Sequence, residues 1–422
     1  MNTTQSTHKK TKTKNNENIS THLFFQTLLI LVAILVSQFS LLCAEGNPPF
    51  GDHIVLRGNL NNSRLQFEQK KTGNVAFLGG SITEAAGYRP MVYDILKKRF
   101  PNTTFTFTNA GIGSTCSNTG AFRLERDVLQ QGPVDLLFVE FAVNDDQDGH
   151  FNRTEAIRGM EGVIRHARMQ NPNLDIVMTF MVNEHIISML QKGEMPISIA
   201  AHDEVAKHYQ IPTISVAKEM TAQIAAGTMT YAQYGGVHPG PVGQALIARM
   251  MDELFSRFWS APLPATAQQV AQVMPAEPLD ALSYFRGRFM DVKLATIKNG
   301  WKIESPDWKN FTGNVAPRFK ALPIPMLCAN EPGAEAAVEF DGTALGAFIL
   351  AGPDAGIVEV SVDGGPSRPI NLFGPYSGGW QYPWTVMLAT DLKPGKHQVT
   401  LRISDKTSRT GHAMRIMQFC VN

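Results

Sequence analysis

The chain has 422 residues, of which 43% are hydrophobic and 18% are charged. This balance excludes an intrinsically disordered polymer, and the length allows two or three domains. Lys and Arg number 38 against 37 Asp and Glu, a net charge of +1, so we expect no nucleic-acid partner held by bulk charge. The four cysteines form no C-x-x-C pair, and we expect no structural zinc, other metal or cofactor.

The first 44 residues have the pattern of an export signal. Several lysines precede an apolar stretch over Leu23–Leu42, and Ala44 offers a small residue at a cleavage edge. The stretch is also nearly long enough to span a bilayer, so an uncleaved N-terminal anchor is the alternative. In both cases we expect the remaining chain to be secreted, periplasmic or on the cell surface. Only the N-terminal segment is then expected to contact a membrane.

Cysteines outside the cytoplasm can form disulfides. Cys328 and Cys420 lie in the same C-terminal half and are candidates for a pair, which leaves Cys116 as a free thiol. The alternative is that all three are small, buried hydrophobic residues. The spacing of the cysteines does not decide between these two states.

Short apolar strands alternate with amphipathic helices from Asn74 to about Trp259. The predicted strands are Val75–Leu78, Phe105–Thr108, Asp135–Phe141, Asp175–Met181 and Thr213–Val216. The predicted helices are Tyr88–Phe100, Thr154–Met169, Ile197–Tyr209 and Pro241–Phe258. This alternation favours a parallel sheet covered by helices on both faces. We therefore expect a three-layer α/β domain over residues 52–260.

The pattern changes after this domain. Residues 261–281 are rich in proline, alanine and glutamine, which predicts a linker. Beyond it the helical period disappears, and short strands such as Val358–Val362 and Gln398–Ile403 stand between turn residues. Short strands between Gly- and Pro-rich turns predict an antiparallel β-sandwich over residues 282–422.

Four short sequence blocks within the α/β region contain residues that could take part in catalysis. The first places Ser81 directly after Gly79 and Gly80 at the end of a strand. By itself this is more often a glycine turn whose serine caps the next helix. The other three blocks are Asn109–Ser114, Ala142–Asp145 and Gly235–Pro239. Because the carboxyl ends of parallel strands lie on one rim of the sheet, we expect the blocks to meet there.

A serine and a histidine on such a rim can hydrolyse esters. A serine hydroxyl is a weak nucleophile, so a neutral imidazole must take its proton during attack on a carbonyl. Histidine has a suitable pKa and can later return the proton to the leaving group. Backbone N–H groups and an amide side chain stabilise the oxyanion that forms. The blocks contain each of these groups.

The four blocks resemble those of the SGNH/GDSL hydrolase superfamily, over about half of the chain. The resemblance implies a flavodoxin-like, three-layer sandwich fold for the α/β domain. It also implies that Ser81 is the nucleophile and His238 the base. It implies an oxyanion hole made by the N–H of Ser81, a backbone N–H of the second block and the Asn144 amide. The spacing leaves Gly113 and Ser114 both open as the donor of that backbone N–H.

The blocks also depart from the family pattern. Gly80 stands where the family has Asp, Ala142 where it has Gly, and Gly235 where it has the Asp that orients the histidine. Removing that acid from an existing catalytic triad can lower the rate about ten-thousandfold. A backbone carbonyl is one substitute, as in some carbohydrate esterases of the superfamily. A distant carboxylate, Glu184 or Asp203, is the other.

An acidic cluster begins at the last residue of the third block. It contains Asp145, Asp146, Asp148 and His150. The cluster lacks the alternation and the glycine of a calcium-binding loop, so we interpret it as a solvated loop rim rather than a metal site. The resemblance implies that Asp145 braces the neighbouring loops.

Aromatic residues gather in the predicted β-sandwich at Tyr376, Trp380, Tyr382 and Trp384. Aromatic rings on a surface can stack on sugars, but we expect at least half of these four to be buried core. Taken together, the sequence predicts a secreted serine esterase that hydrolyses O-acyl, chiefly O-acetyl, esters on carbohydrate through an acyl-serine intermediate. An exported lipase or lysophospholipase and a non-catalytic glycan-binding protein are the alternatives.

Overall fold

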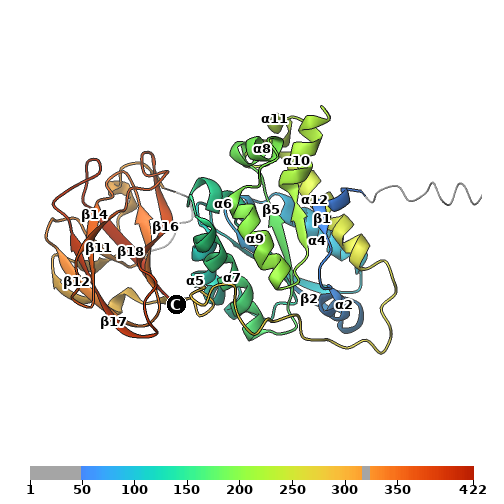
Figure 1. Ribbon diagram of the computed structural model, residues 1–422, viewed down its shortest axis with the longest axis horizontal. Helices are drawn as coiled ribbons and strands as arrows, with labels where there is room; N and C mark the ends of the chain where they lie inside the picture. The colour runs from blue at the N-terminus through green and yellow to red at the C-terminus, as the bar shows by residue number, and fades with distance from the viewer. Residues whose placement is uncertain (1–48, 316–323) are drawn as a thin grey trace, which may run out of the picture. The chain divides into compact units, whose positions relative to one another are not determined.

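The computed structural model describes residues 49–315 and 324–422 (Figure 1). The predicted leader at residues 1–44 lies outside the described residues. In the part of the chain that is described, none of the helices has the length and apolar character needed to cross a bilayer. Residues Asp52–Asn422 form one compact unit.

A six-stranded sheet forms the centre of the N-terminal part, in the order β1-β6-β5-β4-β2-β3 (Figure 1). Its strands are β1 (Ile54–Val55), β2 (Thr72–Gly79), β3 (Thr104–Gly111), β4 (Leu136–Glu140), β5 (Asp175–Phe180) and β6 (Thr213–Ser215). All neighbours pair in parallel except β1, which pairs antiparallel with β6 at the edge. Without β1, this is the strand order of flavodoxin-like folds, so the predicted fold class is confirmed.

Helices connect the strands and cover both faces of the sheet. They are α2 (Asn61–Leu65), α3 (Ser81–Glu84), α4 (Tyr88–Arg99), α5 (Ser117–Asp127), α6 (Ala142–Gln147), α7 (Arg153–Gln170), α8 (Glu184–Gln191), α9 (Ile197–His208), α10 (Val216–Ala225), α11 (Tyr231–Tyr234) and α12 (Pro241–Phe258). α5, α7 and α9 pack side by side, and α4 packs against α12 in the other layer (Figure 1). Asn152 caps α7 in a reciprocal pair with Glu155, and Pro241 opens α12 at a position that needs no N–H.

The order of the strands determines where a ligand can bind. From β2 the chain crosses to β3 on one side, and then returns to β4 on the other side of β2. A crevice opens at such a switch point beyond the carboxyl ends of the strands. β4 is buried along its whole length, as its apolar sequence predicts. The ends of β2 and β4 are therefore held rigidly by the core.

The C-terminal part consists of two β-sheets. Their strands are β7 (Arg288–Met290), β8 (Thr296–Asn299), β9 (Lys302–Glu304), β10 (Asn314–Val315), β11 (Met326–Ala329), β12 (Glu335–Gly342), β13 (Leu345–Ala351), β14 (Ile357–Val362), β15 (Arg368–Asn371), β16 (Trp380–Ala389), β17 (Gly395–Ile403) and β18 (Met414–Val421). One sheet has the order β10-β16-β13-β18-β11-β9, with β7 also on β18, and the other β15-β14-β17-β12-β8. Only the short β10–β16 pair among the described strands of these two sheets is parallel. The predicted antiparallel β-rich architecture is confirmed.

The side chains between the two β-sheets form a continuous apolar core. In β17 the residues Val399, Leu401 and Ile403 point inward and alternate with more exposed residues, as a half-buried strand requires. Of the aromatic group, Tyr382 is buried and Trp384 packs against this core. Trp380 and Tyr376 are 47% and 36% exposed. The expectation that half of the group belongs to the core is thus confirmed.

The suggested disulfide between Cys328 and Cys420 does not form. All three cysteines in the described part of the chain are free and buried. β11 pairs with β18 so that Cys328 lies opposite Arg415, five positions along the strand from Cys420. Burial raises the pKa of Cys328 to about 11 and that of Cys116 well above its ordinary value. These thiols therefore behave as small hydrophobic residues.

The predicted linker, residues 261–281, is hydrogen-bonded to the α/β part. Arg168 donates from α7 to the Val273 carbonyl at 2.6 Å, and the buried carboxylate of Glu161 accepts from the N–H groups of Leu279 and Asp280. Further on, α5 contacts β7 and β16, and Thr119 donates a buried hydrogen bond of 2.8 Å to Thr385. The boundaries at 52–260, 261–281 and 282–422 stay predictions.

Asp175→Asn should flatten the pH dependence of unfolding. Asp175 begins β5 and accepts from the Ser63 N–H at 2.8 Å and from Gln272 at 2.5 Å. Burial outweighs these bonds and raises the pKa of Asp175 from 3.8 to about 7. Between these two values the folded protein keeps a proton that the unfolded chain has released, so this group makes stability fall as pH rises.

The measurement is the free energy of unfolding by denaturant at several pH values. We expect the Asn variant to lose a slope of up to about 1.4 kcal/mol per pH unit between about pH 4 and 7. The exposed Asp94→Asn serves as the matched control. An unchanged slope in Asp175→Asn would show that the folded protein does not hold this proton.

Candidate active site

The turn between β2 and α3 carries Ser81. Two glycines precede it, and the space around them explains both. A Cβ on Gly79 would lie 2.2 Å from the Glu140 carboxylate, and one on Gly80 would lie 2.1 Å from the Asn144 side-chain oxygen. Neither position has room for a side chain. The family's Asp at position 80 therefore cannot be accommodated in this arrangement.

Glu140 fixes this turn from below, and sequence reasoning missed it. It ends β4, and one carboxylate oxygen accepts from the Gly80 N–H at 2.9 Å and from the Thr83 hydroxyl at 2.7 Å. The other oxygen has no hydrogen-bond partner among the described residues, and burial raises the pKa of Glu140 to about 7. A single charged residue at the end of an apolar strand was the available signal.

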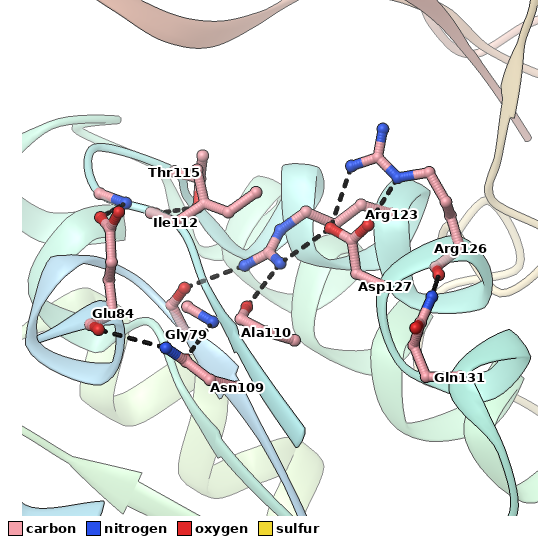
Figure 2. Close-up of polar contacts among 12 residues, drawn as sticks. Gly79, Glu84, Asn109, Ala110, Ile112, Thr115, Arg123, Arg126, Asp127 and Gln131 are labelled. Atoms are coloured by element: carbon pink, nitrogen blue, oxygen red, sulfur yellow. Dashed lines mark hydrogen bonds and ion pairs between the residues drawn. The ribbon is translucent and has the colours of Figure 1, made fainter. Parts of the chain in front are cut away.

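Arg123 on α5 ties the ends of β2 and β3 together. Its guanidinium donates to the carbonyls of Gly79 at 2.9 Å and of Ala110 at 2.6 Å, and pairs with Asp127 (Figure 2). The side chain is fully buried. Because α5 was not among the predicted helices, this residue too was missed. It holds the Ser81 turn and the second block in register.

His238 lies beside Ser81. The loop between α11 and α12 brings its Nε2 to 2.8 Å from the Ser81 Oγ. The N–H of Gly240 donates to the Tyr234 carbonyl, and the Gln244 side chain donates to the Pro239 carbonyl, each at 2.8 Å. These bonds fix the loop on both sides of the histidine. The structure thus brings the first and the fourth block together, as the sequence predicts.

No carboxylate can stand at position 235. Gly235 has a φ of +113°, a conformation that side chains rarely adopt, and a Cβ there would lie 2.0 Å from the Gly240 nitrogen. The two alternative acids are not bonded to the ring either. Asp203 accepts from Arg57 at 2.8 Å, and Glu184 begins α8. Over residues 49–315 and 324–422, the Ser81 contact is the only hydrogen bond of the His238 ring.

The second block contributes a tight loop in which Gly113 and Ser114 differ. The Gly113 N–H donates to the Glu84 carboxylate at 2.7 Å. Ser114 has a φ of +62°, and its N–H has no hydrogen-bond partner in the described part of the chain. The Asn109 side chain donates to the Glu84 carbonyl and steadies the start of the loop (Figure 2). Of the two N–H groups, that of Ser114 is the one left for a ligand.

The third block begins α6 and carries Asn144. The Asn144 amide donates to Asp148 at 2.7 Å. Asp148 also accepts from the Tyr376 hydroxyl at 2.6 Å and from the Gln147 side chain at 3.1 Å. Burial raises the pKa of Asp148, while these hydrogen bonds act to lower it. A residue of the C-terminal part is thus bonded to the group that holds Asn144.

The expectation of a solvated loop rim at the acidic cluster is wrong for Asp145 and Asp148, whereas His150 is exposed. Asp145 and Asp148 are 0% and 3% exposed, because α6 turns them into the protein. Asp145 accepts from the Ser117 N–H and hydroxyl, and lies 2.9 Å from His202. It therefore braces α5, α6 and α9. Among the described residues, no group of three or more His, Cys, Asp or Glu side chains could hold a metal ion.

A pocket of about 510 Å³ opens over Ser81 and His238. The α/β part contributes Ser114 to its lining, and the C-terminal part contributes Tyr376 and Trp380. The lining includes the carboxylates of Glu84 and Asp148, and among the described residues it contains no Lys or Arg.

Comparison with known proteins agrees with this geometry. Residues 77–246 match the model of the GDSL-like Lipase/Acylhydrolase family. No curated protein matches the chain. A two-domain esterase (CEX) active on acetylated mannans, co-crystallised with mannopentaose, is 21% identical, with a TM-score of 0.70 over 87% of this chain and 96% of that one. A second structure of that esterase gives a TM-score of 0.68 with the same identity and coverage.

At this identity the likeness concerns the fold, an α/β part followed by a β-rich part. The family match covers all four blocks, from the strand before Ser81 to the helix after His238. Residues 77–246 therefore form a GDSL-like lipase/acylhydrolase domain, and the protein is a carboxylic ester hydrolase.

Proposed function

We propose that this protein is an exported serine esterase that removes O-acyl groups, chiefly O-acetyl, from carbohydrate through an acyl-Ser81 intermediate. The observation that carries the proposal is the 2.8 Å contact between the Ser81 Oγ and the His238 Nε2. That contact lies in a pocket that exposed Tyr376 and Trp380 also line. Export rests on the pattern of the first 44 residues.

In the first step, the Ser81 oxygen attacks the ester carbonyl carbon while its proton passes to His238 Nε2. The tetrahedral intermediate collapses, the carbon–oxygen bond to the sugar breaks, and His238 returns the proton to the leaving sugar oxygen. Water then attacks acyl-Ser81 with the same histidine as base. The products are a free sugar hydroxyl and the carboxylic acid.

Three donors would stabilise the oxyanion. They are the N–H of Ser81, the N–H of Ser114 and the second N–H of the Asn144 amide. The bond from Gly113 to Glu84 supports Ser114 over Gly113 in this role. Such donors act because they are fixed before the charge develops.

The base works here without an adjacent acid. The backbone at Gly235 excludes the family's carboxylate, and neither Asp203 nor Glu184 is bonded to the ring. We propose a Ser81–His238 dyad in which the fixed loop, rather than a third side chain, orients the imidazole. The bonds of Gly240 and Gln244 to that loop supply the rigidity.

The pocket favours a neutral sugar ester as substrate. Exposed aromatic rings offer apolar faces on which pyranose rings can stack. Glu84 and Asp148 place two carboxylates in the pocket lining, close to Ser81. These carboxylates disfavour substrates that carry a net negative charge, such as uronates and anionic phospholipids. The similar two-domain esterase is active on acetylated mannans, and we propose the same class of acetylated, neutral polysaccharide for this protein.

Ser81→Ala and His238→Ala should each lower kcat at least about a thousandfold, because each removes one half of the nucleophilic pair. Acetate release from acetylated mannan and hydrolysis of 4-nitrophenyl acetate measure the loss. Combining the two changes should cost little more than either alone, since the residues act as a unit.

Exposed Ser260→Ala is the matched control, and circular dichroism checks that each variant folds. A chelator should leave the wild-type rate unchanged. Near-normal turnover by Ser81→Ala would contradict the mechanism. Glycan binding without ester hydrolysis by the wild-type protein would favour the non-catalytic alternative.

Substrate charge and acyl length should both matter. We expect kcat/KM for acetylated mannan to exceed that for acetylated, acidic galacturonan by at least about tenfold at low salt. Added salt should lower this ratio, because it screens the repulsion between the carboxylates of the pocket and those of the substrate. Acetyl esters should be cleaved faster than octanoyl esters, and lysophospholipid should not be cleaved. Preferred cleavage of long-chain esters or lysophospholipid would favour the lipase alternative.

A further inference from the structure

Hydrogen bonds lead from the candidate oxyanion amide across to the C-terminal β-rich part. The Asn144 amide donates to Asp148 at 2.7 Å, and the Tyr376 hydroxyl donates to the other oxygen of Asp148 at 2.6 Å. Gln147 donates to that same oxygen at 3.1 Å and to the Tyr376 hydroxyl at 3.2 Å. Tyr376 and Asp148 are 228 positions apart in the sequence.

We propose that Tyr376 is a positioning residue for the oxyanion hole. Its hydroxyl holds Asp148, and Asp148 fixes the orientation of the Asn144 amide. The inference rests on the proposed function, because it assigns Tyr376 a part in the chemistry at Ser81. It goes beyond that function because the C-terminal part then completes the catalytic machinery, in addition to binding sugar.

The chemistry of an amide explains why Asp148 matters. An asparagine side chain has two N–H donors on one side and an oxygen on the other, and a half-turn about its last bond exchanges them. A carboxylate only accepts, so it selects the orientation in which the nitrogen faces Asp148. The oxygen then lies against Gly80, where a Cβ would be 2.1 Å away. With one N–H bound to Asp148, the direction of the other is determined.

The environment of Asp148 explains why it needs Tyr376. Asp148 is 3% exposed, and burial raises its pKa against the hydrogen bonds that act to lower it. The neighbouring negative charge of Asp145 on the same helix adds to that rise. A buried carboxylate keeps its place only while donors satisfy its oxygens. The Tyr376 hydroxyl is the closest donor in the set, at 2.6 Å.

The Tyr376 hydroxyl is itself fixed. It accepts from Gln147 while it donates to Asp148, so both of its hydrogen-bonding functions are engaged. The ring makes an edge contact with buried Tyr382, with 5.5 Å between the ring centres. The contact with Tyr382 therefore helps to hold the Tyr376 ring, and with it the hydroxyl, in place.

The test uses the full-length enzyme and 4-nitrophenyl acetate, which has no sugar to contact the aromatic rings. Tyr376→Phe removes only the hydroxyl. We expect kcat to fall about tenfold with KM changed less than about twofold, because a hydrogen bond to a charged group is lost and no substrate contact is removed. Asn144→Ala removes the amide itself and should lower kcat about a hundredfold or more, which sets the upper limit for the effect of Tyr376→Phe.

A double-mutant cycle separates action through Asp148 from any other effect of Tyr376. Asp148→Asn should lower kcat at least as much as Tyr376→Phe does. Tyr376→Phe should then add nothing in the Asp148→Asn background, because the hydroxyl no longer has a carboxylate to hold. Additive losses would overturn the inference. If Tyr376→Phe does not fold, unchanged kcat in Asp148→Asn overturns it by itself.

Two control variants remove comparable bonds elsewhere. Tyr209→Phe breaks a hydroxyl bond of 2.9 Å to the buried Glu161, and Thr385→Val breaks the buried bond of 2.8 Å to Thr119 between the α/β and β-rich parts. Both should lower the melting temperature and leave kcat unchanged. A loss of kcat in Thr385→Val as large as in Tyr376→Phe would mean that a loosened interface is responsible, and would overturn the inference.

The outcomes also separate this inference from the proposed function. If Ser81→Ala retains activity, the mechanism itself fails. If Ser81→Ala is inactive but Tyr376→Phe has wild-type kcat, only the role of Tyr376 is refuted. A loss confined to KM for acetylated mannan would likewise refute it, because such a loss reports sugar binding alone.

Discussion

A hydrogen bond of 2.8 Å between Ser81 and His238 joins two loops that are 157 positions apart in the sequence. The proposed mechanism requires that both loops keep their positions relative to each other. The Glu140 carboxylate holds the serine turn from below, and the Gly240 and Gln244 bonds hold the histidine loop. The sheet supplies the common base, because the ends of β2 and β4 flank its switch point.

The glycines show how the departures from the family pattern arise from packing. Gly80 leaves room for the Asn144 side chain, and Gly235 adopts a left-handed turn against the Gly240 backbone. A Cβ at position 80 would collide with the Asn144 side chain, and one at position 235 with the Gly240 nitrogen. We therefore interpret the absence of a family acid beside His238 as a consequence of how this loop closes.

Much of the fold and part of the site could be predicted from the sequence. The strands and long helices show their periods over many residues, and the four blocks stand at strand ends that a parallel sheet must bring together. The groups that hold the site could not be predicted in this way. Glu140 and Asp148 act because they are buried, and Tyr376 meets Asp148 across 228 positions. No local pattern encodes burial at a strand end or a contact of that range.

Covalent labelling tests the central claim most directly. An activated phosphonate ester reacts with a serine only where a base removes the hydroxyl proton and donors stabilise the new oxyanion. Intact-mass and peptide analysis of the labelled protein should find one adduct, on Ser81, and none in Ser81→Ala or His238→Ala. Labelling of another residue in an active enzyme, or ester hydrolysis by a protein that never takes the label, would contradict the account.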